Sequence, residues 1–562
     1  MKRLSPADSR PAFASICSDV WQHRLERSPF LALLAGARLT RLPEISLRAA
    51  EERATFMKAQ LERVQTLDHT ELTYHEQLIA RTLEWDLARA AEEVETWWYF
   101  FPVTPFSSPL SDALQILSSI PLNTTERLED FEHIAQHLPN LLDDMYARLE
   151  AQFQRGIVLP QAELEIVIPY LSNFLQPPEK SPFLVRPESI NEAVKDAGAT
   201  LRVRIDRLIE AELNPRIEKL IGWLKGDYAR SAPDRVGLYQ YPGGLDAYQH
   251  LIRKHLTLDL DPQQVHALGL EAVEAVMAQM AEVRAQLGYS GSAADYRDVL
   301  KREPYFYAKT PEEVGERLMG YVTRLTPRIP EYFSALPKAP FSVKRLAPEF
   351  EGSVTFGYYD LPNQFDPVGY YVYNGSDLTN RPLIYAAGLI YHELVPGHHF
   401  QLVRQMESEH IPLVSRYAFH TAYVEGWAEY AAELAGEMGL YVEPLDWYGR
   451  LLMHLFTAVR IVVDSGMNAL GWTREQASAY MRERIIESET QISTETLRYA
   501  VDIPGQALTY KMGHRKFQEL RAREQAKLGA AFDIRHFHES VLGYGSMPFP
   551  VLEWHLDHVP AE

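Results

Sequence analysis

The sequence predicts a mainly α-helical protein with one small β-sheet. Three observations support this class. Apolar residues recur at helical spacing opposite charged faces in many segments, signals for helix starts and loops lie between them, and one region is rich in β-branched and aromatic residues. The helical segments lie near residues 11–27, 43–67, 74–94, 124–155, 189–225, 261–287 and 310–336.

Local signals mark the ends of these helices. Asp261 followed by Pro262 predicts an N-cap with proline at the first helical position. Proline-rich stretches at 102–109 and 177–187 are typical of loops. The second stretch is also our expected junction between two lobes.

The β-region consists of short runs at residues 342–343, 353–360 and 369–374, bounded by Gly, Pro and Asn. It lies directly before a helix expected at Pro382–Leu394. Two interpretations are open. Residues 353–374 either form the wall of a substrate cleft, where an edge strand pairs with extended substrate backbone, or form a structural hairpin packed on helices.

The most informative run, YHELVPGHHF, begins at residue 391. It joins His392 and Glu393 to a second pair, His398 and His399. Two imidazoles can bind zinc, and a neighbouring carboxylate can take a proton from the water that the metal activates. The usual pattern, H-E-x-x-H, places both ligands on one helix face, but here Pro396 occupies the position of the second histidine.

The proline changes how the run is interpreted. In a regular helix, residue i+6 lies about 120° round the axis and residue i+7 about 10.5 Å along it, so neither later histidine stacks over His392. Because Pro396 breaks helical hydrogen bonding and Gly397 permits unusual dihedrals, we expect a local bulge that makes His398 the second ligand. His399 is the alternative. The other interpretation is a plain helix end with surface or core histidines.

A third ligand candidate lies 27 residues after His398, in the helical segment AYVEGWAEYAAE. Its Glu425, Glu429 and Glu433 share one helix face. Such stripes are usually solvated, but Trp427 and two tyrosines surround Glu425 with large apolar surface. An antiparallel helix pair can therefore set Glu425 against the imidazoles, with Glu429 as a further ligand or as the group that orients a histidine.

Four separated motifs resemble a known bacterial family. In order they read YHELVPGHHFQ, AYVEGWAEYAAE, LRYAVDIPGQALTYKMGH and FDIRHFHESVLGYGSMPFPVLE, and the upstream LTLDLDPQQVHALGLEAV is similar too. The family is the one catalogued as domain of unknown function 885. The resemblance extends from about residue 240 to the C terminus and is weaker before it. That family is in turn similar to gluzincin metallopeptidases such as thimet oligopeptidase, carboxypeptidase Taq and angiotensin-converting enzyme.

The resemblance implies a fold. It would be one two-lobed helical unit over residues 1–562, with a deep central groove and a small β-sheet beside the zinc helix. The approximate parts are an N-terminal lobe at 1–180, a catalytic lobe at 240–562, substrate strands within 341–374 and zinc helices within 382–437.

The resemblance also implies a site. Zn²⁺ would be held by His392, His398 and Glu425, and Glu393 would be the general base. The relatives mostly carry H-E-x-x-H, so the two inserted residues leave the choice between His398 and His399 open. Tyr358 and Tyr359 of the strand region are candidate substrate contacts.

Tyr510 is our candidate for the donor that stabilises the oxyanion of a hydrolysed carbonyl. It lies in a segment that predicts a helix after a Pro-Gly pair, with Gln506, Tyr510 and His514 on one face. Gln506 and Lys511 are candidates to clamp a peptide carboxylate. A core tyrosine with a satisfied hydroxyl is the alternative for Tyr510. Weaker candidates of the same kind are His514, His420, Arg498 and Tyr499.

Composition restricts the class of protein. The single cysteine, Cys17, excludes an intrachain disulfide framework. The first 25 residues lack the apolar stretch of a signal peptide, and no run reaches about 18 apolar residues, so we expect a cytoplasmic protein. The formal charge of −20 argues against nucleic acid or an anionic membrane surface as a partner.

Together these patterns predict a zinc-dependent hydrolase that cleaves short peptides inside a groove. One alternative is a metal-dependent amidohydrolase that acts on a non-peptide amide or a peptide conjugate. Another is a non-catalytic helical protein that binds peptides and has lost the metal. The sequence does not determine cleavage specificity, exo- or endo-action, or oligomeric state.

Overall fold

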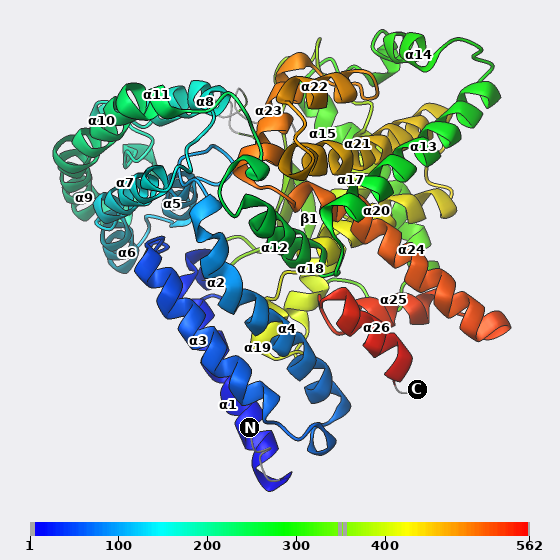
Figure 1. Cartoon of the computed structure of the whole chain (residues 1–562), viewed down its shortest axis with the longest axis horizontal. Helices are drawn as coiled ribbons and strands as arrows, with labels where there is room; N and C mark the ends of the chain where they lie inside the picture. Colours follow the sequence, from blue (N-terminus) through cyan, green and yellow to red (C-terminus); the bar gives the residue numbers. More distant parts are fainter. Residues whose placement is uncertain (1–5, 347–350, 352–356, 560–562) are drawn as a thin grey trace.

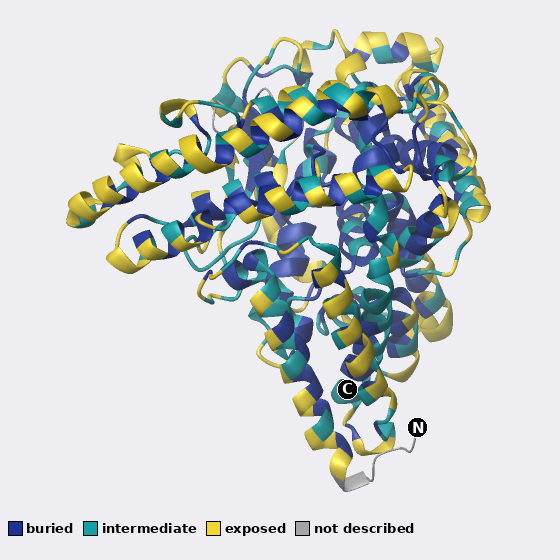
Figure 2. Ribbon diagram, turned by 60° about the vertical axis from the view of Figure 1, so that its left-hand side comes forward, coloured by how far each residue is buried: buried dark blue, intermediate teal, exposed yellow. Residues whose placement is uncertain are grey.

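The computed structural model describes residues 6–346, 351 and 357–559. This part of the chain is mainly helical and contains one three-stranded sheet, as the sequence predicts. Long N-terminal helices lie at the lower left of Figure 1, a curved group of helices lies at the far left, and a larger body lies on the right. Buried residues concentrate inside that body (Figure 2). No described helix is both long and apolar enough to cross a membrane.

The N-terminal helices are α1 (Pro6–Arg27), α2 (Pro29–Leu34), α3 (Leu47–Gln65) and α4 (Tyr74–Thr96). Ala32 and Leu33 of α2 belong to the main core, whereas α1, α3 and α4 share a small separate core. Ile16, Val20, Val64 and Leu87 meet in this core. Helix α4 begins with a capping box. The Thr73 hydroxyl accepts from the backbone N–H of Glu76, and the Glu76 carboxylate accepts from the backbone N–H of Thr73.

The curved group at the left is built from short helices. They are α5 (Pro109–Ser119), α6 (Thr125–Ala135), α7 (Leu138–Gln154), α8 (Gln161–Ser172), α9 (Lys195–Leu208), α10 (Asn214–Trp223) and α11 (Ala229–Ser231), with π-helical η6 (Ile209–Leu213) and η7 (Leu224–Tyr228) between the last three. The single helix expected at 124–155 is therefore divided, and Pro139 opens α7, since proline suits the first turn of a helix. The helix expected at 189–225 begins at Lys195 and continues to Ser231 through the two π-helical turns.

The next helices lead into the body. They are α12 (Gly244–Leu256), α13 (Pro262–Gln286), α14 (Ala293–Leu300), α15 (Pro311–Leu325) and α16 (Ile329–Tyr332). The expected cap of α13 is confirmed: the Asp261 carboxylate accepts from the backbone N–H of Gln264 at 2.8 Å. The helix expected at 310–336 is interrupted after Leu325, where two prolines follow.

The sheet has the strand order β1-β3-β2, with β1 (Phe341–Arg345), β2 (Tyr358–Asp360) and β3 (Gly369–Tyr373). Strand β3 is central, parallel to β1 and antiparallel to β2, so β2 is an edge strand. Residues 353–356 of the strand expected at 353–360 lie outside the described residues.

The C-terminal half carries the remaining helices. They are α17 (Ala386–Glu393), α18 (His398–Glu407), α19 (Leu413–Arg416), α20 (Thr421–Glu437), α21 (Pro444–Ala469), α22 (Arg474–Arg482), α23 (Glu489–Leu497), α24 (Thr509–Leu528), α25 (Ile534–Leu542) and α26 (Phe549–His558). The helix expected at Pro382–Leu394 begins only at Ala386, because the backbone N–H of Leu383 donates to Phe306 at 2.6 Å instead.

Helix α21 is the centre of this half. It is almost wholly buried, as expected of a helix surrounded by others, and buries charged side chains such as Arg450 and Asp464 among its apolar ones. Helices α13 and α17 pack against it, while α20 packs between α17 and α24. This packing brings residues from four distant parts of the sequence to one place.

Candidate metal centre and the cavity around it

The two histidine pairs lie on two helices. Helix α17 ends at Glu393 and α18 begins at His398, with a tight turn between them that contains a cis Val395–Pro396 peptide bond. A Cβ on Gly397 would lie 1.8 Å from the carbonyl oxygen of the residue five positions before it, so the turn requires glycine. Trp427 Nε1 donates to the Pro396 carbonyl at 3.0 Å and ties the turn to α20.

The expected bulge within one helix is therefore wrong. Pro396 ends the helix, as the alternative interpretation states, because the chain cannot continue its hydrogen bonding there. His392 and His398 nevertheless lie close together, because the turn brings the start of α18 back to the end of α17. His392 is 3% exposed and His398 is 9% exposed.

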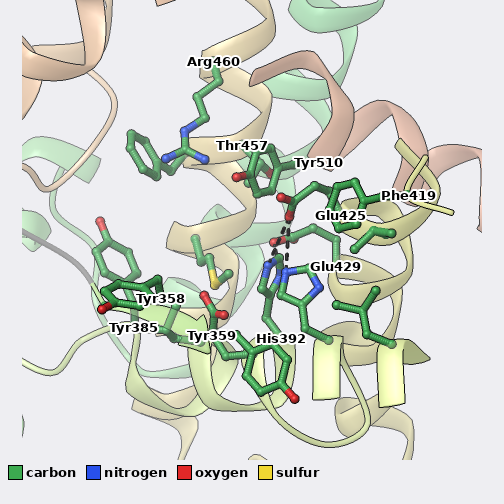
Figure 3. Close-up of a pocket in the computed structure, with 18 of the residues that line it drawn as sticks. Tyr358, Tyr359, Tyr385, His392, Phe419, Glu425, Glu429, Thr457, Arg460 and Tyr510 are labelled. Atoms are coloured by element: carbon green, nitrogen blue, oxygen red, sulfur yellow. Dashed lines mark ion pairs between the residues drawn. The ribbon is translucent and has the colours of Figure 1, made fainter. Parts of the chain in front are cut away.

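Three side chains meet at one point in this region. The Oε2 atom of Glu425 lies 3.5 Å from Nε2 of His392 and 3.4 Å from Nε2 of His398. One ligand atom from each residue lies within 4.8 Å of the others. Figure 3 shows Glu425 above His392, with both contacts dashed. Helix α20 delivers the carboxylate, and the ends of α17 and α18 deliver the imidazoles.

The arrangement fits a zinc ion. Zinc–ligand bonds of roughly 2.0–2.1 Å at tetrahedral angles give edges of about 3.3–3.4 Å between ligand atoms, close to the two distances observed. The Oε2 atom of Glu425 is buried and has no hydrogen-bond partner among the described residues. A buried carboxylate oxygen is costly without a partner, and a cation between these three atoms removes that cost. Three protein ligands are also the number found at catalytic zinc.

Electrostatics favour a cation at the same point. Burial alone would raise the pKa of Glu425, but the two imidazoles outweigh it and hold that pKa well below its usual range. Burial opposes the charge of His392, yet Glu425 and Glu429 raise the pKa of that imidazole to about 10. Burial raises the pKa of Glu393. The raised pKa of His392 thus reflects negative potential from the two glutamates at that ring, which favours a cation there.

Glu429 lies behind His392, outside the three-residue cluster. Its Oε1 atom lies 3.0 Å from Nδ1 of His392, on the far side of the ring from Glu425. Arg450 donates from Nη1 to Oε2 of Glu429 at 2.8 Å and from Nη2 to its carbonyl oxygen at 2.9 Å. A carboxylate behind a ligating histidine fixes the ring and raises its basicity.

His399 does not take part in the cluster. Its Nε2 lies 3.1 Å from the Ala339 carbonyl and so carries the proton, while Nδ1 accepts from the Tyr359 hydroxyl at 2.8 Å. Both ring nitrogens are used, so the structure favours His398 over His399.

Tyr510 reaches the site through a close helix contact. A Cβ on Gly426 of α20 would lie 2.4 Å from the backbone of Gly513 on α24, so the two glycines let the helices touch. The contact places the Tyr510 ring parallel to His392, with centroids 6.1 Å apart. Gln506 Nε2 donates a long hydrogen bond of 3.4 Å to the Tyr510 hydroxyl.

A cavity of about 410 Å³ opens beside these groups. Its wall contains the three candidate ligands, Glu393 and Tyr510, with Tyr358 and Tyr359 of edge strand β2 facing them (Figure 3). The volume lies in the range of small-molecule sites, and the remaining wall is largely apolar and aromatic.

Other predicted residues are not brought into the cavity. Lys511 contacts His454 and His514 because it lies about 100° round α24 from Tyr510. His514 pairs with Glu433, and His420 lies 2.8 Å from Asp86. Their predicted roles at the site, and the Lys511 clamp, are corrected accordingly.

Gln506 does not line the cavity either. Its amide nitrogen donates to the Tyr510 hydroxyl, and its Oε1 accepts from Arg498 Nη2 at 3.0 Å. Its amide therefore supports the wall from behind, which corrects its predicted contact with substrate.

The sequence reasoning missed Arg450 and Arg460 and gave Arg498 little weight. Arg460 and Arg498 line the cavity, and Arg450 holds Glu429. The available signal was two arginines and two aspartates in the largely apolar run that forms α21, because buried charges are rare without a partner or a ligand.

Comparisons with known proteins place the chain in a family. Residues 29–556 match the family model described as "Bacterial protein of unknown function (DUF885)". A search of curated proteins found no significant match.

Solved structures share the fold. A "putative lipoprotein" from Colwellia psychrerythraea is 26% identical and has a TM-score of 0.89, with 98% of this chain and 99% of that chain covered. A "putative lipoprotein of unknown function" from Shewanella oneidensis is 20% identical, has a TM-score of 0.71 and covers 97% of this chain and 100% of that chain. A Bacillus anthracis protein described as an oligoendopeptidase F reaches a TM-score of only 0.27, too low to carry an argument. The chain therefore belongs to the DUF885 family of bacterial proteins, whose function is unknown.

Proposed function

We propose that this protein is a zinc-dependent hydrolase that cleaves peptide bonds of short peptides inside the cavity. One observation carries the proposal: two imidazole nitrogens and an unpartnered, buried carboxylate oxygen face one another in the wall of a cavity. The two-lobed fold with a central groove and the relation to gluzincin peptidases belong to this proposal.

His392, His398 and Glu425 would hold the ion. Zinc bound there would supply Lewis acidity and lower the pKa of a water at the open position. Glu393, the last residue of α17, lies in the cavity wall beside the ligands. Its half-buried carboxylate is suited to accept the proton of the attacking water and to pass it to the leaving amine.

Tyr510 would stabilise the developing negative charge. Its hydroxyl accepts from Gln506, and it donates to no other described residue, so its proton is available to a substrate carbonyl oxygen. Edge strand β2 faces the same space with Tyr358 and Tyr359 and offers unpaired backbone groups to an extended substrate.

The size of the cavity limits the substrate. Its volume of about 410 Å³ admits a few residues of extended chain and excludes a folded protein. The substrate class is therefore short peptides.

Two measurements test the proposal. Elemental analysis of the purified chain should give about one zinc per chain, and a panel of di- to decapeptides should be hydrolysed in a manner that a chelator stops and added zinc restores. Hydrolysis of acylated amines without peptide cleavage would favour the amidohydrolase alternative. A chain that lacks zinc and refuses added zinc would favour the peptide-binding protein.

Cytoplasmic location stays a prediction. Two relatives of solved structure carry the description "putative lipoprotein", and fractionation of cells that produce the chain would test the location directly.

A further inference from the structure

Two arginines lie in the cavity wall away from the metal ligands. Arg460 of α21 has a side chain that is 9% exposed, and Arg498, which begins π-helical η11 (Arg498–Asp502), has one that is 16% exposed. Figure 3 shows Arg460 reaching into the region beside Thr457 and Tyr510. The proposed hydrolysis makes no use of either arginine.

The two guanidinium groups share one carboxylate. Arg460 Nη2 lies 3.3 Å from Oε2 of Glu495, and Arg498 Nη1 lies 3.5 Å from its Oε1. Glu495 also accepts from Gln491 at 3.0 Å and from the Tyr499 hydroxyl. One carboxylate that accepts four donors cannot neutralise two cations. The Nε atoms of both arginines have no hydrogen-bond partner in the described part of the chain.

Other acids near the two arginines compensate only in part. Asp464 and Asp502 interact with Arg498, and burial raises the pKa of each to about 7. Glu487 lies beside Tyr385, and burial raises the pKa of its carboxyl to about 7. Aromatic rings meanwhile hold the Arg460 guanidinium in place, with its Cζ 4.2 Å from the Phe456 ring centre and 4.9 Å from that of Tyr510. This end of the cavity thus presents a fixed, partly unpaired positive charge.

The distance between the two arginines and the candidate metal ligands limits how many peptide residues can lie between them. The Tyr510 ring lies between the two sites, 6.1 Å from the His392 ring and 4.9 Å from Arg460 Cζ. Extended peptide spans roughly 3.3–3.6 Å per residue, so one or two residues fit between a scissile bond at the ligands and a group held by the arginines.

We propose that Arg460 and Arg498 bind the C-terminal carboxylate of the peptide, so that the enzyme removes one or two residues from the C-terminal end. The cleavage in this inference rests on the proposed function, whereas the direction of the bound peptide rests on the arginine pair. Guanidinium groups match carboxylates with paired, charge-assisted hydrogen bonds. The same charge repels an N-terminal ammonium group, which excludes the opposite orientation.

The test measures binding without turnover. Glu393→Gln protein, supplied with zinc, is titrated by calorimetry with N-acetylated tripeptides that end in a free carboxylate or in an amide. The acid should bind about tenfold or more tightly than the amide, as expected for a paired charge contact. Equal affinities would overturn the proposal, and this comparison needs no change at the arginines.

Variants assign the effect to the arginines. In the Glu393→Gln background, Arg460→Gln or Arg498→Gln should bring the acid-to-amide ratio close to one. Arg482→Gln, on exposed α22, is the matched control and should leave the ratio unchanged. A ratio that survives both cavity substitutions would overturn the assignment.

A third peptide separates two sources of the carboxylate. It ends in an amide but carries glutamate as its last residue. If it binds as tightly as the acid, the arginines read a side chain and the C-terminal proposal is wrong; the expected result is binding like the plain amide. Failure of wild-type protein to cleave any peptide would remove the proposed function, whereas the binding ratio reports on the anchor separately.

Discussion

Two clusters on helix α20 contain the same residue types but have different connections. The first contains His392, His398 and Glu425. The second lies two turns further along α20 and contains Glu433 with His454 and His514. In the first cluster the nitrogen and oxygen atoms face one point without hydrogen bonds between them. In the second, Glu433 pairs with one nitrogen of His514, and Lys511 lies between the other nitrogen and His454.

Lys511 makes the second cluster self-sufficient. Its ammonium group supplies the cation that the first cluster lacks, and Gln518 donates a further hydrogen bond of 2.7 Å to Glu433. Burial and the nearby Lys511 lower the pKa of His454, which keeps that imidazole neutral as an acceptor. Arg450 extends from Glu429 toward Glu433 and lies between the two clusters.

The comparison shows that residue types alone do not make a metal site. A site needs lone pairs that converge on one point and have no partner within the protein. The second cluster is a chain of donors and acceptors, so an ion has nothing to satisfy there.

The largest expected effect is loss of metal from the first cluster only. His392→Ala or Glu425→Ala should weaken zinc binding by about three orders of magnitude, because two ligands hold zinc poorly. His454→Ala in the second cluster should retain about one zinc per chain. Elemental analysis after dialysis measures both, and equal zinc loss in the two sets would break the comparison.

Removal of the base should affect turnover but not metal. Glu393→Gln should lower kcat about a thousandfold, since a positioned base contributes roughly 10²–10⁴, while zinc content stays unchanged. Glu433→Gln, on the neighbouring helix, is the control and should hydrolyse peptides within about twofold of wild type. Unchanged kcat in Glu393→Gln would remove that residue as the base.

The group behind His392 should have an intermediate effect. Glu429→Gln removes the charge that orients the imidazole and should weaken zinc binding about 10- to 100-fold. Because Arg450 then loses its buried partner, the variant should also be less stable by about 3–5 kcal/mol. Competition with a zinc chelator, measured well below the melting temperature, separates the two effects. Unaltered zinc affinity would show that Glu429 does not act through His392.

Lys511 should give the second cluster its own pH dependence. Burial lowers the pKa of Lys511 from 10.5 to about 8. Between pH 8 and 10.5 the folded state has lost this proton while the unfolded state keeps it, so the stability of wild type should rise relative to Lys511→Met. The rise should be about 1.4 kcal/mol per pH unit and absent below pH 8. Urea unfolding of both proteins at pH 7, 8, 9 and 10 measures the difference, and a flat difference would contradict the buried ammonium.

The last expected result is that replacing Lys511 does not change the number of zinc ions bound per chain. Lys511→Met should still bind about one zinc per chain, since His514 offers its two nitrogens in opposite directions and the second cluster does not converge. Isothermal titration with zinc measures this number. If Lys511→Met bound a second zinc ion per chain, the lysine alone would be what prevents the second cluster from binding metal.

Local signals predicted much of the secondary structure. The Asp261 cap, the N-terminal helices and the short strands follow from spacing and end residues, which act within a few positions. The division of the helix at 124–155 does not follow from the apolar period, which continues across the break while Pro139 opens a new helix. The π-helical turns within the helix from Lys195 to Ser231 have no such local signal either.

The candidate site was predicted less completely. The run around His392 and the stripe around Glu425 identified the convergent residues, since few other functions need those types at that spacing. Lys511 shares a helix with Tyr510, but one residue along a helix turns the side chain by about 100°. His514 lies on the Tyr510 face one turn further along α24, where it pairs with Glu433 instead. Arg460 was missed because its surroundings are supplied by α23 and η11.

The sequence by itself determined where most helices lie, the edge strand and the residue types around His392, because helical period, caps and proline act locally. Tertiary structure alone decided which of two histidines faces Glu425, which glutamate stands behind His392, and which of two similar clusters is closed by a lysine. These choices depend on how α17, α18, α20, α21 and α24 pack, and packing is set by close approaches such as Gly426 against Gly513.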